Sequence, residues 1–340
     1  MLLIRNPHRF PDMFKLRRAL LALGVLSACA TSAPVAFAQP DSYPSRPITI
    51  VVGYPPGGST DLVGRVVADE MAKVLKATLV IENIGGAGGV LGAQKVVNAK
   101  PDGYTLLVGV NNELVIAESI NKSVKYKGAR DLEPVALLAT QPLVLVASPK
   151  AGVRNAAEFV DAVKKAPGKY SFGSSGIGTS LHLTGELVKD KAGLDMLHVP
   201  YRGVGPLATD LLAGNIPYGV FVLSSALPHL KAGKLVPIGT SEAKRSSVTP
   251  DIPALAEHPA MKGIDLSSWF MLAGPKGLPE PVVAKLRAAA YEALKAPAVR
   301  QKLEAAGASV PAPVADLPKF MLAETEKFRR IAQGAKIEAE

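Results

Sequence analysis

The sequence predicts an α/β fold built as two lobes with a ligand cleft between them. Strand-like and helix-like segments alternate through residues 43–110, at the spacing expected of parallel strands joined by helical crossovers. The alternation repeats in the middle of the chain, and the residues after 275 read as helical, without a low-complexity linker. The simplest architecture with these features is a pair of α/β lobes connected by strands that pass between them.

The first α/β unit contains three strands and two helices. Apolar runs predict the strands, and apolar residues at helical spacing predict the helices. Their order is strand 47–54, helix 60–75, strand 77–83, helix 85–99 and strand 102–110. Ser59 or Thr60 is expected to cap the first helix, because serine and threonine hydroxyls accept hydrogen bonds from free backbone N–H groups there.

The second unit follows the same pattern, and the C-terminal region is helical. The expected order is strand 142–149, helix 155–168, a strand from 170 into the turn 173–180, helix 181–193, strand 195–201, helix 205–214 and strands 218–225 and 234–241. Residues 280–307 predict two helices joined at Pro297, and residues 317–334 predict a third. The last helices are expected to return to the first lobe.

Segments near 135–146 and 265–274 are expected to cross between the lobes. The first lobe is then discontinuous and contains residues 43–142 plus 265–340, whereas the second lobe contains residues 143–264.

The composition is that of a globular protein with a modest basic excess. The chain is 48% hydrophobic and 20% charged, with a formal net charge of +10, part of which lies in the first 38 residues. Such an excess suits anionic small ligands. No Lys/Arg run is interleaved with aromatic residues, so we expect no nucleic-acid partner.

The N-terminus has the pattern of an export signal over residues 1–38. A basic region precedes a short apolar core and the small-residue site "AFA" before Gln39, while Met13 begins a signal of more usual length. Cys29 lies in "LSAC", which resembles a lipobox and offers the alternative of a lipid tether. Both alternatives place the folded part in the periplasm. Because Cys29 is the only cysteine, no intrachain disulfide can form.

Four turns share one chemistry, which points to an anion. Each lies at a strand end, is rich in Gly, Ser, Thr or Pro, and leads into a helix: 55–61, 85–89, 173–180 and 202–206. Ligands of open α/β sheets bind at the carboxyl ends of strands, and a helix N-terminus offers unpaired N–H groups. The candidate binding residues are Pro56, Gly57, Gly58, Ser59, Thr60, Asp61, Ser174, Ser175, Gly178, Thr179, Ser180, Tyr201 and Arg202.

The expected ligand is a carboxylate and not a phosphate, because no lysine stands in the turn "GYPPGGSTD". The hydroxyls of Ser59 and Thr179 are expected to contact the ligand without a role in the stability of the ligand-free protein. Several residues have alternative roles: Asp61 at the cleft rim or beside the helix dipole, Arg202 on a carboxylate or in solvent, and Tyr201 in the site wall or the core. His182 is either a packing or surface residue or a ligand-binding residue.

Motifs of other site classes are absent from the sequence. The phosphate loop G-x-x-x-x-G-K-[ST], the dinucleotide fingerprint G-x-G-x-x-G, the esterase elbow G-x-S-x-G and the zinc motif H-E-x-x-H do not occur. No Cys/His cluster suggests a metal. We therefore expect no catalytic residues, no metal and no cofactor, although any single glycine turn is also common in ordinary strand-to-helix connections.

Residues 43–340 resemble the periplasmic substrate-binding proteins of tripartite tricarboxylate transporters, the Bug family. The resemblance rests on an ordered series of motifs: "YPSRPITIVVGYPPGGSTD", "IENIGGAGGVLGA", "PDGYTLLVG", "PGKYSFGSSGIGTSLHL", "VPYRGVGPLATDLLAGN" and "EPVVAKLRAAAYEALKAP". The chain departs from the family where Gly53-Tyr54 stands in place of the usual Pro-Phe.

The resemblance implies a two-lobed periplasmic-binding-protein fold of type II, or Venus flytrap, that closes over a ligand between its lobes. It implies a monomeric receptor that binds a small organic anion, a carboxylate, and delivers it to the integral-membrane subunits of the transporter. It also implies that the turns "PPGGSTD" and "SSGIGTS" face each other across the cleft. The alternative is an extracytoplasmic enzyme or a ligand sensor on the same α/β scaffold.

Overall fold

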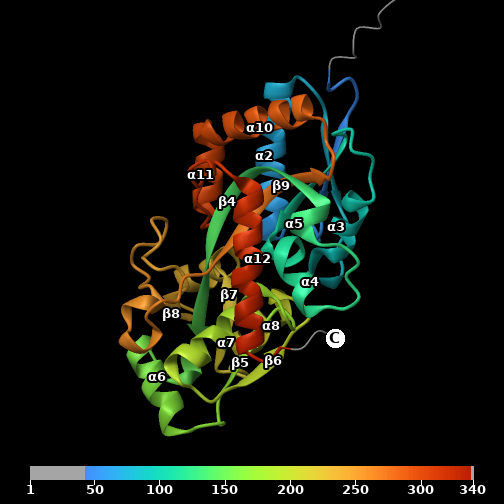
Figure 1. Ribbon diagram of the computed structural model, residues 1–340. Coiled ribbons are helices and arrows are strands. Elements are labelled where there is room, and N and C mark those ends of the chain that lie inside the picture. Colours follow the sequence, from blue (N-terminus) through green and yellow to red (C-terminus); the bar gives the residue numbers. More distant parts are fainter. Residues whose placement is uncertain (1–42, 338–340) are drawn as a thin grey trace, which may run out of the picture. The chain divides into compact units, whose positions relative to one another are not determined.

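The computed structural model describes residues 43–337 (Figure 1). The predicted signal peptide over residues 1–38, with Cys29 and the cleavage site before Gln39, lies outside the described residues. From Pro44 onwards the chain forms one compact unit. No helix in the described part of the chain is long and apolar enough to cross a bilayer.

The first group of strands surrounds β1 (Ile48–Val52). Strands β2 (Leu79–Asn83) and β3 (Thr105–Val110) pair with β1 in parallel, which confirms the predicted unit of three parallel strands. Strand β9 (Ser267–Pro275) then pairs with β3 in the antiparallel direction. Four of the five residues of β1 are buried, as expected where helices cover both faces of a parallel sheet.

Strand β4 (Leu132–Ala147) links this group to a second one. Its residues up to Pro142 pair with β9, and its residues from Leu143 pair with β7 (Tyr218–Val222) and β8 (Val236–Thr240). Strand β5 (Ser171–Ser174) pairs in parallel with β7 and with the edge strand β6 (Leu197–Pro200). The predicted α/β fold is therefore confirmed, whereas the lobe boundaries 43–142 plus 265–340 and 143–264 stay a prediction.

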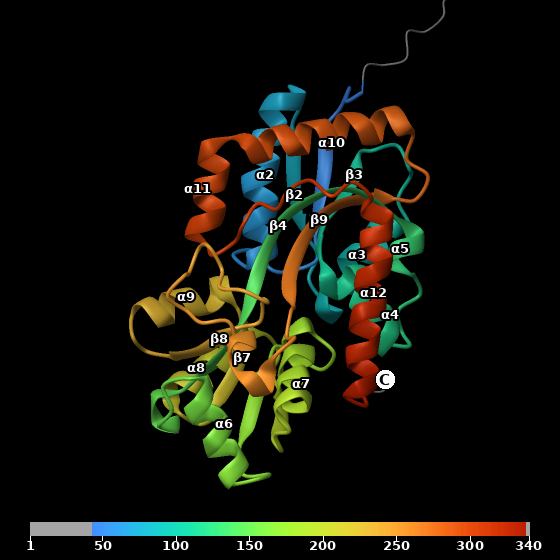
Figure 2. The same ribbon diagram turned by 60° about the vertical axis from the view of Figure 1, so that its left-hand side comes forward.

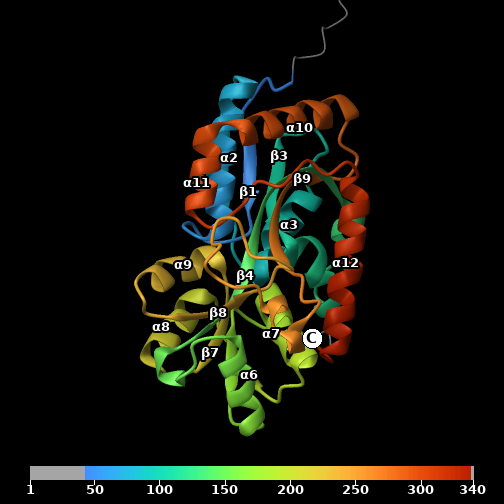
Figure 3. The ribbon, with the colours of Figure 1, turned by 90° about the vertical axis from the view of Figure 1, so that its left-hand side faces the viewer.

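Helices pack against both groups of strands. Helix α10 packs on α2 and β4, while α12 packs on α5 and reaches α7 with its C-terminal half (Figures 2 and 3). The helices are α2 (Ser59–Leu75), α3 (Val90–Val97), α4 (Ala117–Ile120), α5 (Gly128–Asp131), α6 (Ala156–Lys165), α7 (Ser180–Ala192), α8 (Val204–Ala213), α9 (Leu223–Lys231), α10 (Glu280–Lys295), α11 (Pro297–Ala305) and α12 (Leu317–Gly334). Short 3-10 turns are η1 (Ala87–Gly89), η3 (Pro149–Ala151), η4 (Leu255–Glu257) and η5 (Pro259–Met261), and η2 (Asn112–Ile116) is a π-helix.

The three predicted C-terminal helices are confirmed as α10, α11 and α12. Helix α9 was not predicted, since Pro228 interrupts its pattern and the apolar run of β7 leads straight into it. The π-helix η2 was also missed, because it directly continues the apolar run of β3.

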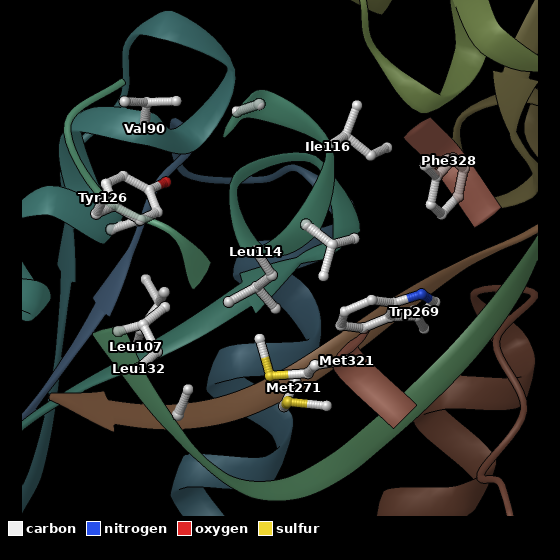
Figure 4. Close-up of a cluster of buried hydrophobic side chains, with 14 of the residues drawn as sticks. Val90, Leu107, Leu114, Ile116, Tyr126, Leu132, Trp269, Met271, Met321 and Phe328 are labelled. Carbon is white, nitrogen blue, oxygen red and sulfur yellow. The ribbon is translucent and has the colours of Figure 1, made fainter. Parts of the chain in front are cut away.

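A buried cluster fixes η2 against the C-terminal helix (Figure 4). Leu114 of η2 packs with Trp269 and Met271 of β9 and with Met321 of α12. The indole Nε1 of Trp269 donates a hydrogen bond of 2.8 Å to Glu324 Oε2. Because Leu114 is anchored in this cluster, the two preceding residues of η2 are held in place at the end of β3.

The expected cap of α2 was wrong, and so was the expectation that Thr179 has no role in stability. Helix α2 begins at Ser59, and its N-cap is Gly58, with no side-chain cap among the described residues. Thr179 is the N-cap of α7, and its hydroxyl accepts a hydrogen bond from His182 N. Ser59 and Thr60 therefore lie inside α2, while Thr179 has a structural role that the sequence did not suggest.

Candidate functional site

All four predicted turns border one cavity of about 500 Å³. The turns before α2 and α3 contribute from one side, and the turns before α7 and α8 contribute from the other. The predicted residues that line this cavity are Pro56, Gly58, Ser59, Thr60, Ser175, Thr179, Ser180 and Arg202. The turns "PPGGSTD" and "SSGIGTS" thus border a common space.

Five predicted residues do not line the cavity and lie elsewhere in the structure. Gly57 is exposed at the tip of its turn, and Gly178 borders a neighbouring pocket. Asp61 and Ser174 are buried beneath their turns. Tyr201 packs against the cluster around Leu207 and Leu211, and its hydroxyl donates to Asp210 Oδ2 at 2.8 Å.

Asp61 holds the first turn in shape. Its carboxylate accepts hydrogen bonds from Gly57 N at 2.9 Å and from Asn83 Nδ2 at 2.8 Å, and it pairs with Arg65. Burial alone would raise the pKa of Asp61, but the hydrogen bonds from Arg65, Gly57 and Asn83 outweigh burial and lower it. Asp61 is therefore an ionised brace of the turn.

The N-terminus of α2 is open toward the cavity. The N–H groups of the first helical turn have no intrahelical partners, and Gly58 supplies no side chain to cap them. Ser59 and Thr60, which begin the helix, line the cavity. These N–H groups and the helix dipole favour an anion at this place.

Two histidines support the second turn from below. Ser174 Oγ lies 2.7 Å from His198 Nε2, and Gly178 N donates a hydrogen bond of 3.0 Å to His182 Nδ1. The two imidazole rings stack with their centroids 3.6 Å apart. Burial lowers the pKa of His182 to about 4 and that of His198 to about 3, so both rings are neutral at pH 7. His182 is thus a buried packing residue, and it does not line the cavity.

The first N–H groups of α7 have more hydrogen-bond partners within the protein than those of α2. Thr179 caps His182 N, and Asn112 Oδ1 accepts a hydrogen bond of 2.9 Å from Ser180 N. Asn112 belongs to η2, at the end of β3, so this bond joins the two sides of the cavity.

Arg202 provides the one charged side chain among the described residues that line the cavity. It is exposed and lies in the turn between β6 and α8. A guanidinium in this position can pair with a carboxylate through two parallel hydrogen bonds. No aspartate or glutamate of the described residues lines the cavity, so nothing there opposes an anion by charge.

Sequence reasoning missed several residues of the lining. Tyr54 and Asn112 follow strands β1 and β3, so the rule of strand ends would have found them. Ser225 and Ser268 come from α9 and β9, where no sequence signal marks them. The other missed residues are Gly53, Val110 and Val222, whereas Pro55, Gly86, Gly88, Gly89, Gly203 and Val204 belong to the predicted turns.

The cavity has the chemistry of a binding site. Its donors are helix N–H groups, hydroxyls, an amide and a guanidinium. Ser174 and His198 are in contact, but Ser174 is fully buried outside the lining. Among residues 43–337, no group of three or more His, Cys, Asp or Glu side chains is placed to hold a metal ion.

Comparison with known proteins identifies relatives across almost the whole chain. BugT of Bordetella pertussis is 33% identical over 327 residues, an alignment that covers 94% of this chain and 98% of BugT. The UPF0065 protein in the tcbD-tcbE intergenic region of Pseudomonas sp. (strain P51) is 34% identical, with 94% and 95% of the two chains covered.

Solved structures have the same fold. MatC from Rhodopseudomonas palustris with bound malate is 34% identical, with a TM-score of 0.76 and coverage of 85% of this chain and 99% of MatC. Rpa4515 of R. palustris with adipate is 28% identical, with a TM-score of 0.81 and coverage of 88% and 100%. The sequence model of the tripartite tricarboxylate transporter family receptor matches residues 63–337. With this match, the similarity to BugT and the shared fold, the chain belongs to the receptor family of the tripartite tricarboxylate transporters, as its motifs indicated.

Proposed function

We propose that this protein is a periplasmic solute receptor that binds a small carboxylate in the cavity and delivers it to the integral-membrane subunits of a tripartite tricarboxylate transporter. Membership of the receptor family supports the transport role. The relatives solved with malate and with adipate support the ligand class. In this proposal the receptor is a monomer whose lobes close over the anion. It does not change its ligand chemically.

The open N-terminus of α2 is the observation that carries the ligand class. Its uncapped N–H groups face a cavity whose described lining has an arginine and no acidic side chain. A carboxylate placed there would accept charge-assisted hydrogen bonds, which are stronger than bonds between neutral groups. Ser175 and Arg202 line the cavity and are placed for the other polar end of the ligand.

The test is incubation of the purified protein with a mixture of small metabolites that includes malate, adipate and neutral sugars. After rapid buffer exchange, mass spectrometry identifies what the protein retains and what it consumes. We expect a carboxylate to be retained unchanged. Retention of a neutral sugar alone would contradict the ligand class, and consumption of a metabolite would favour the enzyme alternative.

A further inference from the structure

A buried carboxyl group lies behind the wall of the cavity. Glu113 of η2 is only 1% exposed, and its Oε1 accepts a hydrogen bond of 2.8 Å from Val110 N. Its Oε2 lies 2.9 Å from the hydroxyl of Tyr54, which lines the cavity. A Cβ atom at Gly89 would come within 2.6 Å of Glu113 Oε2, so only glycine lets the turn before α3 lie against this carboxyl.

The hydrogen bonds around Tyr54 require one more proton than an ionised Glu113 supplies. The Tyr54 hydroxyl lies 2.8 Å from Gly88 O and 2.9 Å from Glu113 Oε2. A phenol has a single hydrogen, whereas a carbonyl and an ionised carboxylate can only accept. Both contacts are satisfied when Glu113 is protonated, donates to Tyr54, and Tyr54 donates to Gly88 O.

The burial of Glu113 also favours its neutral form. Two titratable groups face it: Tyr54, and Tyr126, whose hydroxyl donates to the backbone oxygen of Glu113 at 2.7 Å. Glu118 of α4 acts electrostatically on Tyr126 and is not among the groups that shift the pKa of Glu113. Helices α3, α5 and α12 and strand β3 bring it no ion-pair partner among residues 43–337. Burial therefore raises the pKa of Glu113 to about 8, although hydrogen bonds partly oppose the rise.

We propose that protonated Glu113 is a positioning residue of the anion site, whose proton holds Tyr54 and the turn 86–89 in the cavity wall. This inference rests on the proposed function, because it concerns how tightly the cavity holds a carboxylate.

Loss of the proton has two consequences for the ligand. Tyr54 must donate to the new carboxylate, so Gly88 O loses its donor, and Gly88 lies in the cavity wall. Ionised Glu113 would also be separated from a bound anion only by the side chain of Tyr54. In these low-dielectric surroundings, the repulsion between the two negative charges is poorly screened. Both effects weaken binding as the pH rises.

The size of the effect follows from the fraction of molecules with neutral Glu113. If only that form binds tightly, a pKa of about 8 lowers the affinity about tenfold between pH 7 and pH 9. Glu113→Gln keeps a neutral side chain that donates to Tyr54 and accepts from Val110 N. Its affinity should be independent of pH in this range and about tenfold higher than that of the wild type at pH 9.

The experiment has two arms. In the first, ¹³C NMR of carboxyl-labelled glutamate in the ligand-free protein identifies Glu113 by the signal that Glu113→Gln removes. We expect this signal to titrate near pH 8, with the amide signal of Gly88 following the same curve. In the second arm, calorimetry measures the binding of malate and adipate at pH 7 and pH 9 to the wild type, Glu113→Gln and the control Glu118→Gln.

Each outcome decides the proposal. A Glu113 signal that titrates below pH 6, or a Gly88 signal that does not follow it, would overturn the inference without reference to any ligand. A wild-type affinity that is flat with pH, or a loss in Glu113→Gln equal to that of the wild type, would also overturn it, whereas Glu118→Gln should keep the wild-type pH dependence. If neither probe binds at either pH, malate and adipate are excluded as ligands, and the first arm alone decides the role of Glu113.

Discussion

Two helix N-termini meet at the cavity, and they differ in how far the protein satisfies them itself. Helix α2 begins after Gly58 and has no side-chain cap among the described residues. Helix α7 is capped by Thr179, and Asn112 accepts a hydrogen bond from Ser180 N. The first N-terminus therefore has free donors for a ligand, whereas the second serves mainly to build the opposite wall.

The two turns also differ in what braces them. The turn before α2 is braced by the ionised Asp61, whose pKa is lowered by its hydrogen bonds despite burial. The turn before α7 is braced by the neutral rings of His182 and His198. Acid should therefore damage the second turn first, because the pKa of His182, at about 4, lies above the lowered pKa of Asp61.

The largest effect is expected when α2 receives the cap it lacks. Gly58 has the extended backbone of an N-cap, and a Cβ atom there would come no closer than 3.7 Å to Pro55 O. In Gly58→Asp, the new carboxylate would bind the free N–H groups and repel the ligand. We expect carboxylate affinity to fall by more than about 100-fold, with thermal stability higher by a few tenths of a kcal/mol.

Calorimetry and thermal unfolding of Gly58→Asp and of Gly58→Ala check this prediction. The alanine variant adds a Cβ atom without a cap and should keep most of the affinity. Equal losses in the two variants would show that bulk, and not occupation of the helix N-terminus, is responsible.

Ser59→Ala should give the next largest effect. The Ser59 hydroxyl lines the cavity and does not cap the helix, so its loss should lower carboxylate affinity by about 1.5–3 kcal/mol, or about 10- to 150-fold. The melting temperature should be nearly unchanged. Ser247→Ala, at an exposed serine outside the cavity, is the matched control. Wild-type affinity in Ser59→Ala would remove this hydroxyl from the site.

Acid should lower the stability of the protein through His182, which supports the turn before α7. The folded protein keeps His182 neutral down to about pH 4, whereas the unfolded chain takes up that proton near pH 6.5. The unfolded state thus binds more protons in this window, and the stability contributed by neutral His182 is lost as the pH falls from 6.5 towards 4. The loss is about 1.4 kcal/mol per pH unit.

Urea unfolding of the wild type and of His182→Gln across this pH range isolates the effect, because other groups with shifted pKa values cancel in the difference. The wild type should lose stability more steeply than the variant as the pH falls. Parallel curves would contradict a neutral, buried His182.

Thr179→Ala should give the smallest change, and mainly in stability. Thr179 caps α7, so its replacement should cost about 1 kcal/mol of unfolding free energy. The effect on carboxylate affinity should be smaller than that of Ser59→Ala, since the N-terminus of α7 is already occupied. Chemical unfolding and calorimetry of the single variant check both parts, and a loss of affinity larger than that of Ser59→Ala would reverse the order of the two turns.

The sequence revealed the strands, the long helices and all four turns, because these depend on local periodicity and on glycine-rich strand ends. It did not reveal the caps. Whether Gly58 or Ser59 caps α2 depends on where the backbone enters the helix, and "GGST" permits several entry points. The strand-end rule could have placed Asn112 at the cavity, but not its hydrogen bond with Ser180. The contact of Glu113 with Tyr54 likewise joins residues that are distant in sequence.

The central claim is that the free N–H groups of α2 bind the carboxylate. A titration of ¹⁵N-labelled protein with the carboxylate retained from the metabolite mixture tests it most directly, through the amide signals of Thr60 and Asp61 in α2 and of Ser180 and His182 in α7. We predict large shifts at Thr60 and Asp61 that saturate with the calorimetric affinity, and smaller shifts at the two amides of α7 that Asn112 and Thr179 already occupy. Shifts confined to α7, with Thr60 and Asp61 unchanged, would contradict the account.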